Sequence, residues 1–554
     1  MSTESTEVSF FGPWPKDQQG AYRPRDPSSQ VLFQVLEEGL EDFLEQVDIE
    51  SGGRGLPSFV IDELRGYLTC GDLRGGFARF KCRGCGFERL LPKSCKSRGF
   101  CSSCLARRAA ERSAYLIDEV LPVVPIRQWV MSLPMNVRYM MLFDHELTLA
   151  VLKVVADSIL GYYRDQAKTQ GIPDGFTGMV SAIQRFGGHL NANIHFHSNL
   201  LDGTFSWSPD GTLSFHEAPM PKQQDITVLC SVIRMRVLEL LKSRGLLGYE
   251  AELDSFADQE PLLASISGAS ITSTIATGQR AGKRVLRLGG GPRNELWATR
   301  KRTFGAHIDG FDLHASTALA AGDREALEAL LRYQLRPPLS KSRLTRLDDG
   351  RVQLKLRSPW SDGTSHLILE PHELIEKLVP LIPRPGTNLI VYHGCLAPRA
   401  KDRESIVAYG RANQSLELDP SCCQQELFDD EEAGEEPRTS RYYSWSELMA
   451  RVHGVDVLEC PRCPSRLKFI DLVTDPLVIT ALLISIGLLA ASSSFRAPPR
   501  PNRCSIGQLP LFSKSDLRFQ AHTTAHSLTT QLDLDTSSGC RSPPGEAETS
   551  RVFH

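Results

Sequence analysis

The 554-residue sequence lacks the marks of an exported, repetitive or P-loop protein. Residues 1–20 show no basic segment followed by an apolar one, so the pattern of a signal peptide is missing. No internal repeat is present. The run Gly289–Gly291 lacks the following Lys-Ser/Thr pair of a phosphate-binding loop, and we interpret it as a turn. We therefore expect a cytoplasmic protein, in which closely spaced cysteines serve as metal ligands rather than disulfides.

Long apolar runs are also scarce. The uncharged stretch Leu477–Ser494 approaches the length of a membrane span. It contains Thr480, Ser485 and Gly487 and ends in three serines, which a span would have to bury in lipid. We expect a buried or partner-facing helix there and no contact with a membrane.

The net charge of −3 would exclude a polyanion-binding protein if the charge were evenly spread, but it is not. Residues 79–112 carry ten Lys/Arg and two Glu, a local net charge of +8. Residues 332–357 carry eight Lys/Arg and two Asp, a net of +6, while residues 426–436 hold seven acids. Because local charge decides where a polyanion binds, the two basic stretches are candidate nucleic-acid contacts.

Asp-Gly turns between short alternating runs predict antiparallel sheet in the middle of the chain. One such turn separates residues 204–207 from 212–215, and another separates 352–357 from 364–369. Helical patterns lie between these runs, so the expected fold class is α+β. The predicted organisation is a disordered N-terminus (1–30), a zinc-binding, DNA-binding domain (31–115), a catalytic domain (116–415), an acidic linker (416–440), a C-terminal helix with a CxxC segment (441–490) and a disordered tail (491–554).

Two CxxC pairs, Cys82/Cys85 and Cys101/Cys104, are separated by fifteen residues. Each pair can direct two thiolates at one tetrahedral ion, and the intervening loop lets the second pair complete the site. We expect a structural Zn²⁺ on these four cysteines, since four sulfurs leave no open coordination position. Cys70 and Cys95 could replace a ligand or complete a second site.

A third pair, Cys460/Cys463, has no evident partner pair and could be half of a zinc ribbon. Basic residues surround the N-terminal cysteines, Lys96 and Arg98 among them. A zinc-organised surface that contacts nucleic acid is the functional interpretation of this block.

Within residues 184–203, polar side chains stand at every second position from Asn191 to Asn199, with Ala192, Ile194 and Phe196 between them, which is the period of a strand. The polar positions, which would share one face, are Asn191, Asn193, His195, His197 and Asn199. Two imidazoles at i and i+2 can bind one divalent ion and leave positions open for substrate oxygens. Gln184 and His189 are candidates for a third ligand, and Asp202 is a weaker one because its Asp-Gly pair already explains a turn.

A covalent nucleophile has to be sought elsewhere. Residues 323–334 predict a helix that ends before Pro337-Pro338, with Tyr333 in its last turn. Arg332 and Arg336 flank this tyrosine and could offset the charge of a phosphodiester. By residue type alone, Tyr162, Tyr163 and Tyr392 are alternatives.

Several segments together resemble the transposases of the insertion sequence 91 family and the related common-region elements. They are QRFGGHLNANIHFHSNLLDG, LLRYQLRPPL, FKCRGCG with SCKSRGFCSSCLARR, SPWSDGTSHLILEP, VYHGCLAPRA and CPRCPSRLKFI. They occur in consistent order over about residues 35–475.

The resemblance implies an HUH (His-hydrophobic-His) endonuclease fold, a central antiparallel sheet with flanking helices, preceded by a small zinc-binding domain. It implies that His195 and His197 hold Mg²⁺ or Mn²⁺ and that Tyr333 is the nucleophile. The expected activity is nicking and rejoining of single-stranded DNA at element ends through a 5′-phosphotyrosine, as in rolling-circle transposition. The expected partners are single-stranded element ends and target DNA.

One position departs from part of this family. Some members carry a second tyrosine four residues before the first, and here that position is Ala329. We therefore expect a single-tyrosine enzyme. Two other functions remain open at this point, a plasmid-type rolling-circle replication initiator and a non-catalytic zinc DNA-binding protein.

Overall fold

The computed structural model describes residues 26–247, 255–289, 304–411 and 443–488. The predicted linker 416–440 and tail 491–554 lie outside the described residues, as does the predicted N-terminal segment except for residues 26–30. The described chain is a mixed α+β structure with antiparallel sheets, as predicted.

A six-stranded antiparallel sheet forms the centre of the molecule, in the order β14-β4-β5-β3-β10-β9. Its strands are β3 (Ile126–Ser132), β4 (Gly178–Phe186), β5 (Ala192–Leu201), β9 (Gly305–Ile308), β10 (Phe311–Leu319) and β14 (Ile390–Gly394). The predicted histidine-bearing strand is β5, which lies between β4 and β3 in the middle of this sheet.

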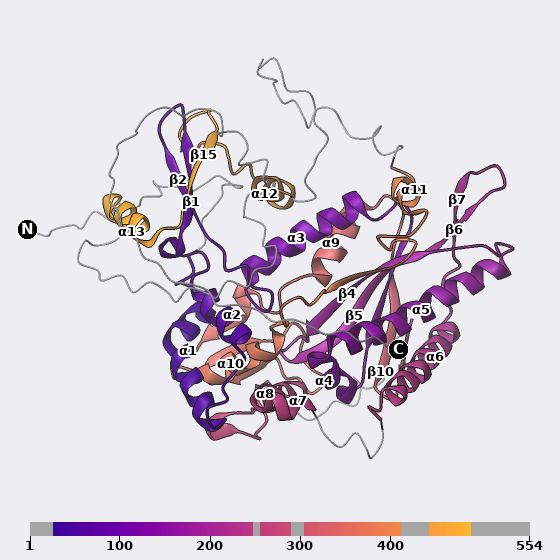
Figure 1. Cartoon of the computed structure of the whole chain (residues 1–554), viewed down its shortest axis with the longest axis horizontal. Coiled ribbons are helices and arrows are strands. Elements are labelled where there is room, and N and C mark those ends of the chain that lie inside the picture. The colour runs from indigo at the N-terminus through magenta and orange to yellow at the C-terminus, as the bar shows by residue number, and fades with distance from the viewer. Residues whose placement is uncertain (1–25, 248–254, 290–303, 412–442, 489–554) are drawn as a thin grey trace, which may run out of the picture.

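Helices cover both faces of the central sheet (Figure 1). The apolar residues of β5, Ile194, Phe196 and Leu200, pack in one core with four helices. These are α4 (Met135–Phe143), α5 (His145–Thr169), α6 (Gln223–Ser243) and α8 (Pro261–Thr272). On the opposite face, α3 (Ser102–Glu119) and α9 (Arg324–Gln334) form a smaller core that includes Leu116 and Leu331. The polar positions of β5 alternate with its apolar ones and therefore face α9.

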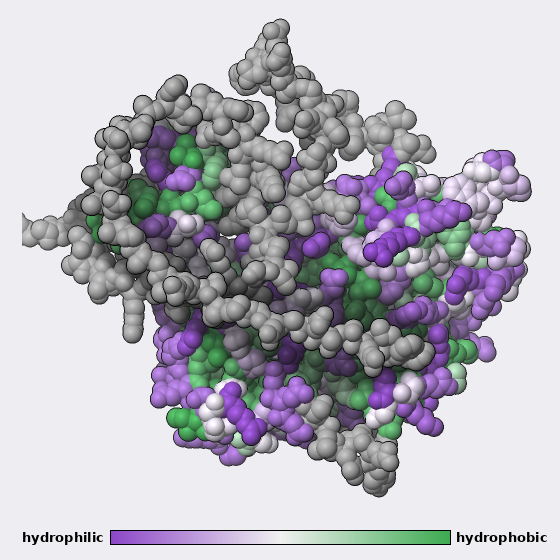
Figure 2. Space-filling model, in the orientation of Figure 1, coloured by the Kyte–Doolittle hydropathy of each residue, from purple (hydrophilic) through white to green (hydrophobic). Residues whose placement is uncertain are grey.

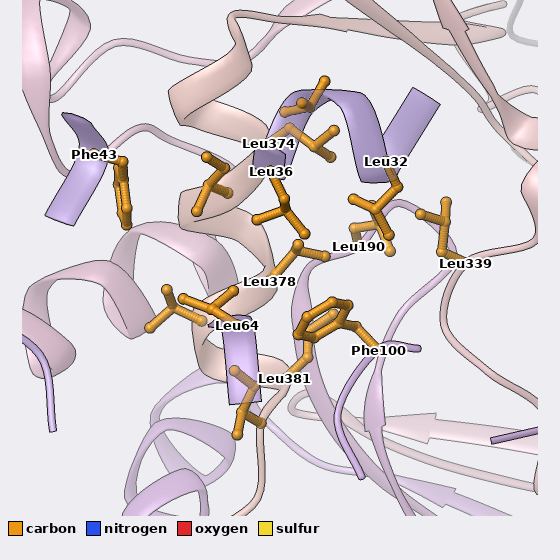
Figure 3. Packing of buried hydrophobic residues seen from close by; sticks show 14 of the residues in the cluster. Leu32, Leu36, Phe43, Leu64, Phe100, Leu190, Leu339, Leu374, Leu378 and Leu381 are labelled. Carbon is orange, nitrogen blue, oxygen red and sulfur yellow. The ribbon is translucent and has the colours of Figure 1, made fainter. Parts of the chain in front are cut away.

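A second core joins the beginning of the chain to its middle (Figure 3). Helices α1 (Val31–Glu50) and α2 (Ser58–Leu68) pack with α10 (Pro371–Leu378) and a four-stranded sheet, in the order β11-β12-β13-β8. The strands are β8 (Leu286–Leu288), β11 (Leu344–Arg346), β12 (Val352–Lys355) and β13 (His366–Leu369). The N-terminal helices thus share one core with residues far along the chain rather than with the nearby residues 77–92.

A three-stranded sheet joins an N-terminal segment of the chain to a C-terminal one. Its order is β15-β1-β2, with β1 (Phe77–Cys82), β2 (Glu88–Pro92) and β15 (Leu467–Val473). The flanking helices are α12 (Trp445–His453) and α13 (Pro476–Ser485). Green side chains are visible in this region in Figure 2, consistent with the exposed Ile470, Leu472 and Leu477.

The remaining elements are α7 (Ser255–Gln259), α11 (Arg403–Ala408) and a hairpin of β6 (Gly203–Trp207) and β7 (Leu213–Glu217). This hairpin and the antiparallel pairing of β12 with β13 confirm the two predicted Asp-Gly turns. The apolar run that begins at Leu477 forms α13, which ends at Ser485. Within the described ranges no helix has the length and apolar character needed to cross a membrane.

Candidate active site and metal centres

His195 and His197 lie side by side on the face of β5 that is turned toward α9. Their ring centroids are 4.9 Å apart. His195 is half-buried, and His197 is only 7% exposed. The strand alternation predicted from the sequence is confirmed, because Ile194 and Phe196 are fully buried on the opposite face.

Hydrogen bonds orient both imidazoles through Nδ1. His195 Nδ1 lies 2.9 Å from the carbonyl oxygen of Asn193, which can only accept, so this nitrogen donates and Nε2 carries a lone pair. His197 Nδ1 lies 2.9 Å from the side-chain amide of Gln128, whose oxygen and nitrogen can exchange places by a flip. With the amide oxygen toward the ring, His197 Nε2 is also free to ligate a metal. Nε2 of His197 is buried without a hydrogen-bond partner, as a metal-ligating nitrogen would be before its ion binds.

Both histidines are neutral at physiological pH, as metal ligation requires. Burial lowers the pKa of His195 to about 4 and that of His197 to about 3. The positive charge of Arg336 also contributes to the lowered pKa in both cases.

The three candidates for a third ligand have different surroundings. Gln184 stands directly opposite His195 in the β4–β5 register, so the two side chains share a face. Its amide nitrogen donates to the carbonyl of Gln334 at 2.8 Å, which leaves the amide oxygen as a ligand atom. His189, in the connection between the two strands, has its Nε2 3.1 Å from Ser273 Oγ and its ring against that of Trp360.

Asp202 is not a ligand at this site, contrary to its weaker candidacy. Its carboxylate forms a buried ion pair with Arg127 at 2.8 Å and accepts a hydrogen bond from Tyr163 at 2.7 Å. It also lies seven residues beyond His195 along an extended chain, about 23 Å away. No sequence pattern indicates that Arg127 neutralises this carboxylate.

Tyr333 occupies the last turn of α9, as predicted, and is 52% exposed. The next residue, Gln334, is buried and exchanges two amide hydrogen bonds with Asn199 of β5, at 2.7 and 2.8 Å. Gln334 also accepts the hydrogen bond from Gln184. The end of the helix is thus attached to the polar face of β5, two residues along the strand from His197.

Two guanidinium groups lie over the Tyr333 ring. Arg336 is 4.0 Å from the ring centroid and Arg357, which follows β12, is 5.6 Å from it. Nε of Arg336 is buried without a hydrogen-bond partner. Burial and the neighbouring charge of Arg357 lower the pKa of Arg336 to about 10, although the nearby Tyr333 opposes this shift.

Arg357 lies in the basic stretch 332–357, where no motif distinguishes it from the other basic residues. No carboxylate within the described part of the chain forms an ion pair with Arg357. An uncompensated pair of guanidinium groups beside a half-exposed phenol is suited to an anionic ligand.

The other tyrosines lie in different surroundings. The hydroxyl groups of Tyr162 and Tyr163, on α5, donate to Asp225 and Asp202, and these rings belong to the core on the opposite face of the sheet. Tyr392, on β14, packs against the core beneath α3, and burial raises its pKa.

Four cysteines converge beside the second core, and we refer to Cys70, Cys95, Cys101 and Cys104 as cluster 1. Their sulfurs all lie within 4.8 Å of one another, and neighbouring pairs are 3.5–3.7 Å apart. Tetrahedral Zn–S bonds of about 2.3 Å place sulfurs about 3.8 Å apart, whereas a disulfide needs about 2.05 Å. The spacing fits one zinc ion.

Four others form cluster 2, which consists of Cys82, Cys85, Cys460 and Cys463. Sulfur distances are 3.4 Å for Cys82–Cys463 and 3.6 Å for Cys85–Cys460. The prediction that Cys82, Cys85, Cys101 and Cys104 share one ion is therefore wrong. Each CxxC pair belongs to a different cluster, because β1 and β2 direct the first pair toward β15 rather than toward α3.

The basic residues near cluster 1 are partly engaged with the protein. A guanidinium nitrogen of Arg98 donates to the carbonyl of Thr387, and burial lowers the pKa of Arg98. Burial and repulsion by Lys93 and Arg107 lower the pKa of Lys96. Lys96 and Arg98 therefore stand among other positively charged side chains close to cluster 1 in the sequence.

Comparison with known protein families gives two matches. Residues 178–404 match the family Y2_Tnp, described as "Putative transposase", and residues 35–133 match Zn_Tnp_IS91, described as "Transposase zinc-binding domain". No curated protein and no solved structure matches the chain. The first match contains β5 and α9, and the second contains all of cluster 1 and the first pair of cluster 2. The chain belongs to the IS91-type transposases, DNA-cleaving and DNA-binding proteins of insertion sequences, with an N-terminal zinc-binding domain before the transposase domain.

Proposed function

We propose that this transposase nicks and rejoins single-stranded DNA at the ends of its element through a 5′-phosphotyrosine on Tyr333, as in rolling-circle transposition. The central sheet with β5 at its middle corresponds, in this proposal, to an HUH endonuclease fold. The observation that carries the proposal is the junction of α9 with β5. Gln334, the residue after the half-exposed Tyr333, is hydrogen-bonded to Asn199, which lies two residues from His197 on the same face of β5. Arg336 and Arg357 lie over the Tyr333 ring.

The donors fit a catalytic divalent ion. The side chains of His195, His197 and Gln184 share one face of the sheet. Nε2 of His197 has no hydrogen-bond partner among the described residues. The resemblance to the family assigns Mg²⁺ or Mn²⁺ to this site, and the amide oxygen together with open positions for water and phosphate oxygens would supply the oxygen ligands that these ions prefer. When bound, the ion polarises the scissile phosphate and offsets its charge.

The remaining chemistry belongs to residues of the chain. Arg336 and Arg357 bind non-bridging phosphate oxygens and place the phosphorus in line with the Tyr333 hydroxyl. The tyrosine oxygen forms a bond to phosphorus as the bond to the 3′ oxygen breaks. The phenol proton goes to solvent, and the leaving 3′ oxygen takes up a proton. Because one phosphodiester replaces another, rejoining needs no nucleotide cofactor.

DNA contacts outside the reaction centre follow the positive charge. In this proposal Lys96, Arg98 and Arg332 bind backbone phosphates, and the structural zinc ions fix the surface that presents them. A single nucleophile, with Ala329 one helical turn before Tyr333, requires that strand exchange use the free 3′-OH rather than a second phosphotyrosine.

The direct test is incubation of the purified protein with end-derived single strands and Mn²⁺, followed by denaturing gels for covalent protein–DNA adducts. We expect an adduct with wild-type protein and with Tyr392→Phe, and none with Tyr333→Phe. An adduct of undiminished yield with Tyr333→Phe removes the nucleophile assignment. Tight binding of DNA without any adduct in the wild type would favour the non-catalytic DNA-binding protein.

A plasmid-type replication initiator would share this chemistry. Its substrate would be a plasmid origin rather than element ends, so a parallel reaction with each kind of strand separates the two functions.

A further inference from the structure

The C-terminal segment Tyr443–Val473, which we call the strap, contacts the hairpin of β1 and β2, which we call the ribbon, in three ways. Strand β15 pairs with β1 along its whole length, from Phe77 opposite Val473 to Cys82 opposite Leu467. The strap's apolar side chains join a small core with Phe80 and Leu91. Cys460 and Cys463 complete cluster 2 across 375 and 381 residues of sequence.

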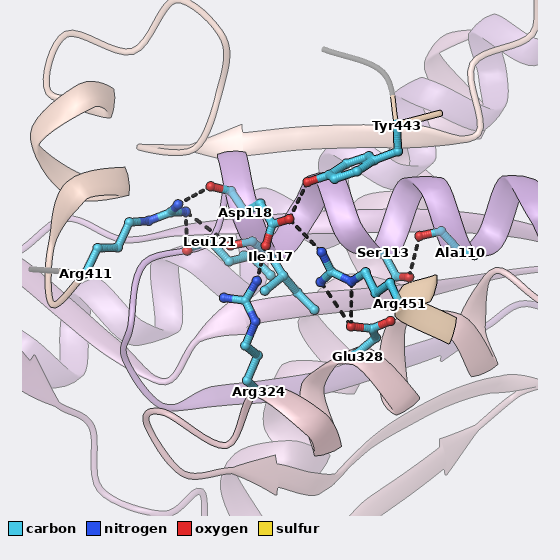
Figure 4. A network of polar contacts seen from close by, with 10 residues as sticks. All are labelled: Ala110, Ser113, Ile117, Asp118, Leu121, Arg324, Glu328, Arg411, Tyr443 and Arg451. Carbon is cyan, nitrogen blue, oxygen red and sulfur yellow. Dashed lines mark hydrogen bonds and ion pairs between the residues drawn. The ribbon is translucent and has the colours of Figure 1, made fainter. Parts of the chain in front are cut away.

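The same strap contacts the helix that carries Tyr333 (Figure 4). Arg451, on α12, forms ion pairs with Asp118 of α3 at 2.6 Å and with Glu328 of α9 at 3.0 Å. The Tyr443 hydroxyl also donates to Asp118, which is in turn paired with Arg324 at the start of α9. Figure 4 shows Asp118 at the centre of this network, with α3, α9 and the strap each contributing a side chain.

This network has the burial needed to position a helix. The side chains of Arg451, Asp118 and Glu328 are each about one-fifth exposed, at 21%, 21% and 18%. Partly desolvated ion pairs that form a network hold geometry better than exposed isolated pairs. Glu328 lies only five residues before Tyr333 on the same helix.

We propose that cluster 2 is a zinc site that fastens the strap to the ribbon, and that the fastened strap positions α9 and its nucleophile through Arg451. Two tethers then hold α9. Gln334 fixes its C-terminal end to β5, and Arg451 fixes its first turns to α3. The effect on Tyr333 rests on the proposed nickase activity, whereas the zinc site and the attachment of the strap do not.

The variant Cys460→Ser/Cys463→Ser tests the zinc site in the full-length protein. Zinc content is measured by mass spectrometry, and the expected result is two zinc ions per wild-type chain and one per variant chain. Cys230→Ser removes a buried cysteine outside both clusters and should retain two. If the double variant retains two zinc ions, or the wild type binds only one, the proposed site is wrong.

Limited trypsin digestion tests the attachment. Arg466 and Lys468 lie in or beside β15 and should be protected in the wild type and cleaved at least tenfold faster in the double-cysteine variant. Unchanged cleavage after loss of one zinc would show that zinc does not hold the strap.

Arg451→Gln tests the link to the nucleophile while leaving cluster 2 intact. This variant should keep two zinc ions and a protected β15 but form the adduct about tenfold more slowly, because a small displacement of a nucleophile lowers the rate strongly. An unchanged adduct rate would refute positioning through Arg451. If the wild type itself forms no adduct, the nickase proposal fails, and the zinc and trypsin measurements still decide the attachment.

Discussion

His195 and His197 lie side by side because they are two residues apart on one strand. Cys85 and Cys460 lie together because β1, in the N-terminal part of the chain, pairs with β15, in its C-terminal part. The first arrangement depends on local periodicity, and the second depends on the completed fold. The two kinds of site should therefore contribute differently to chemistry and to stability. Loss of the histidine pair should affect chemistry more than stability, whereas loss of cluster 1 should affect stability more than chemistry.

The largest expected effect is that of His195→Ala/His197→Ala on adduct formation. We expect a loss of about 10³-fold or more, because the charge stabilisation supplied by a bound ion amounts to several kcal/mol. The urea midpoint should fall by less than it does on loss of cluster 1, since both imidazoles lie on the polar face of β5 rather than in the apolar core on its other face. A variant that unfolds instead would show that the histidine pair is needed for stability. Initial rates and urea unfolding curves decide between the two outcomes.

Cys101→Ser should have the opposite effect. Cluster 1 lies against a core with Tyr67 and Phe100, so loss of its ion should lower the free energy of unfolding by at least about 3 kcal/mol and remove one zinc per chain. The matched change Cys230→Ser, in another core, should cost clearly less. Equal stability losses in the two variants would mean that cluster 1 holds no structural ion.

Arg357→Ala tests the role of the two guanidinium groups in the reaction centre. Deleting one of the two guanidinium groups over Tyr333 should lower the adduct rate about 30-fold, the value of a charge-assisted hydrogen bond to phosphate. Arg351→Ala is the control, because that arginine is exposed, belongs to the same basic stretch and pairs with Asp349. Similar rates for the two variants would remove Arg357 from the phosphate site.

The smallest effect concerns the residue that orients His197. Gln128→Ala should weaken activation by Mn²⁺ about tenfold, as second-shell changes do, and leave the rate at saturating metal almost unchanged. Ser181→Ala removes a buried polar partner on the opposite face of the same sheet and should leave the metal dependence as it is. The measurement is the adduct rate as a function of Mn²⁺ concentration. An equal or larger loss of Mn²⁺ activation in Ser181→Ala than in Gln128→Ala would contradict the prediction.

The sequence predicted those parts of the molecule that follow from local rules. The period of β5 predicted the histidine pair, and the helix predicted over residues 323–334 is observed as α9, with Asp323 as its N-cap. Asp-Gly pairs located the hairpins.

The partners of Cys460 could not be predicted, because they depend on the pairing of β1 with the distant β15. The position of Arg357 could not be predicted, because it depends on where the end of β12 lies relative to α9. The two CxxC pairs were assigned to one ion because their spacing permits it, but spacing cannot show that β2 intervenes. Likewise, the ion pair of Asp202 with Arg127 requires knowledge that β3 lies beside β5.

The split composition of cluster 2 has a consequence for synthesis on the ribosome. Cys82 and Cys85 emerge first, but their partners follow 375 or more residues later. At roughly 5–20 residues per second, this delay is about 20–75 seconds. Throughout that interval β1 has an unpaired edge and two uncoordinated thiols. The nascent ribbon therefore needs protection from oxidation and from pairing with other chains, and premature termination anywhere before residue 460 would leave it permanently in that state.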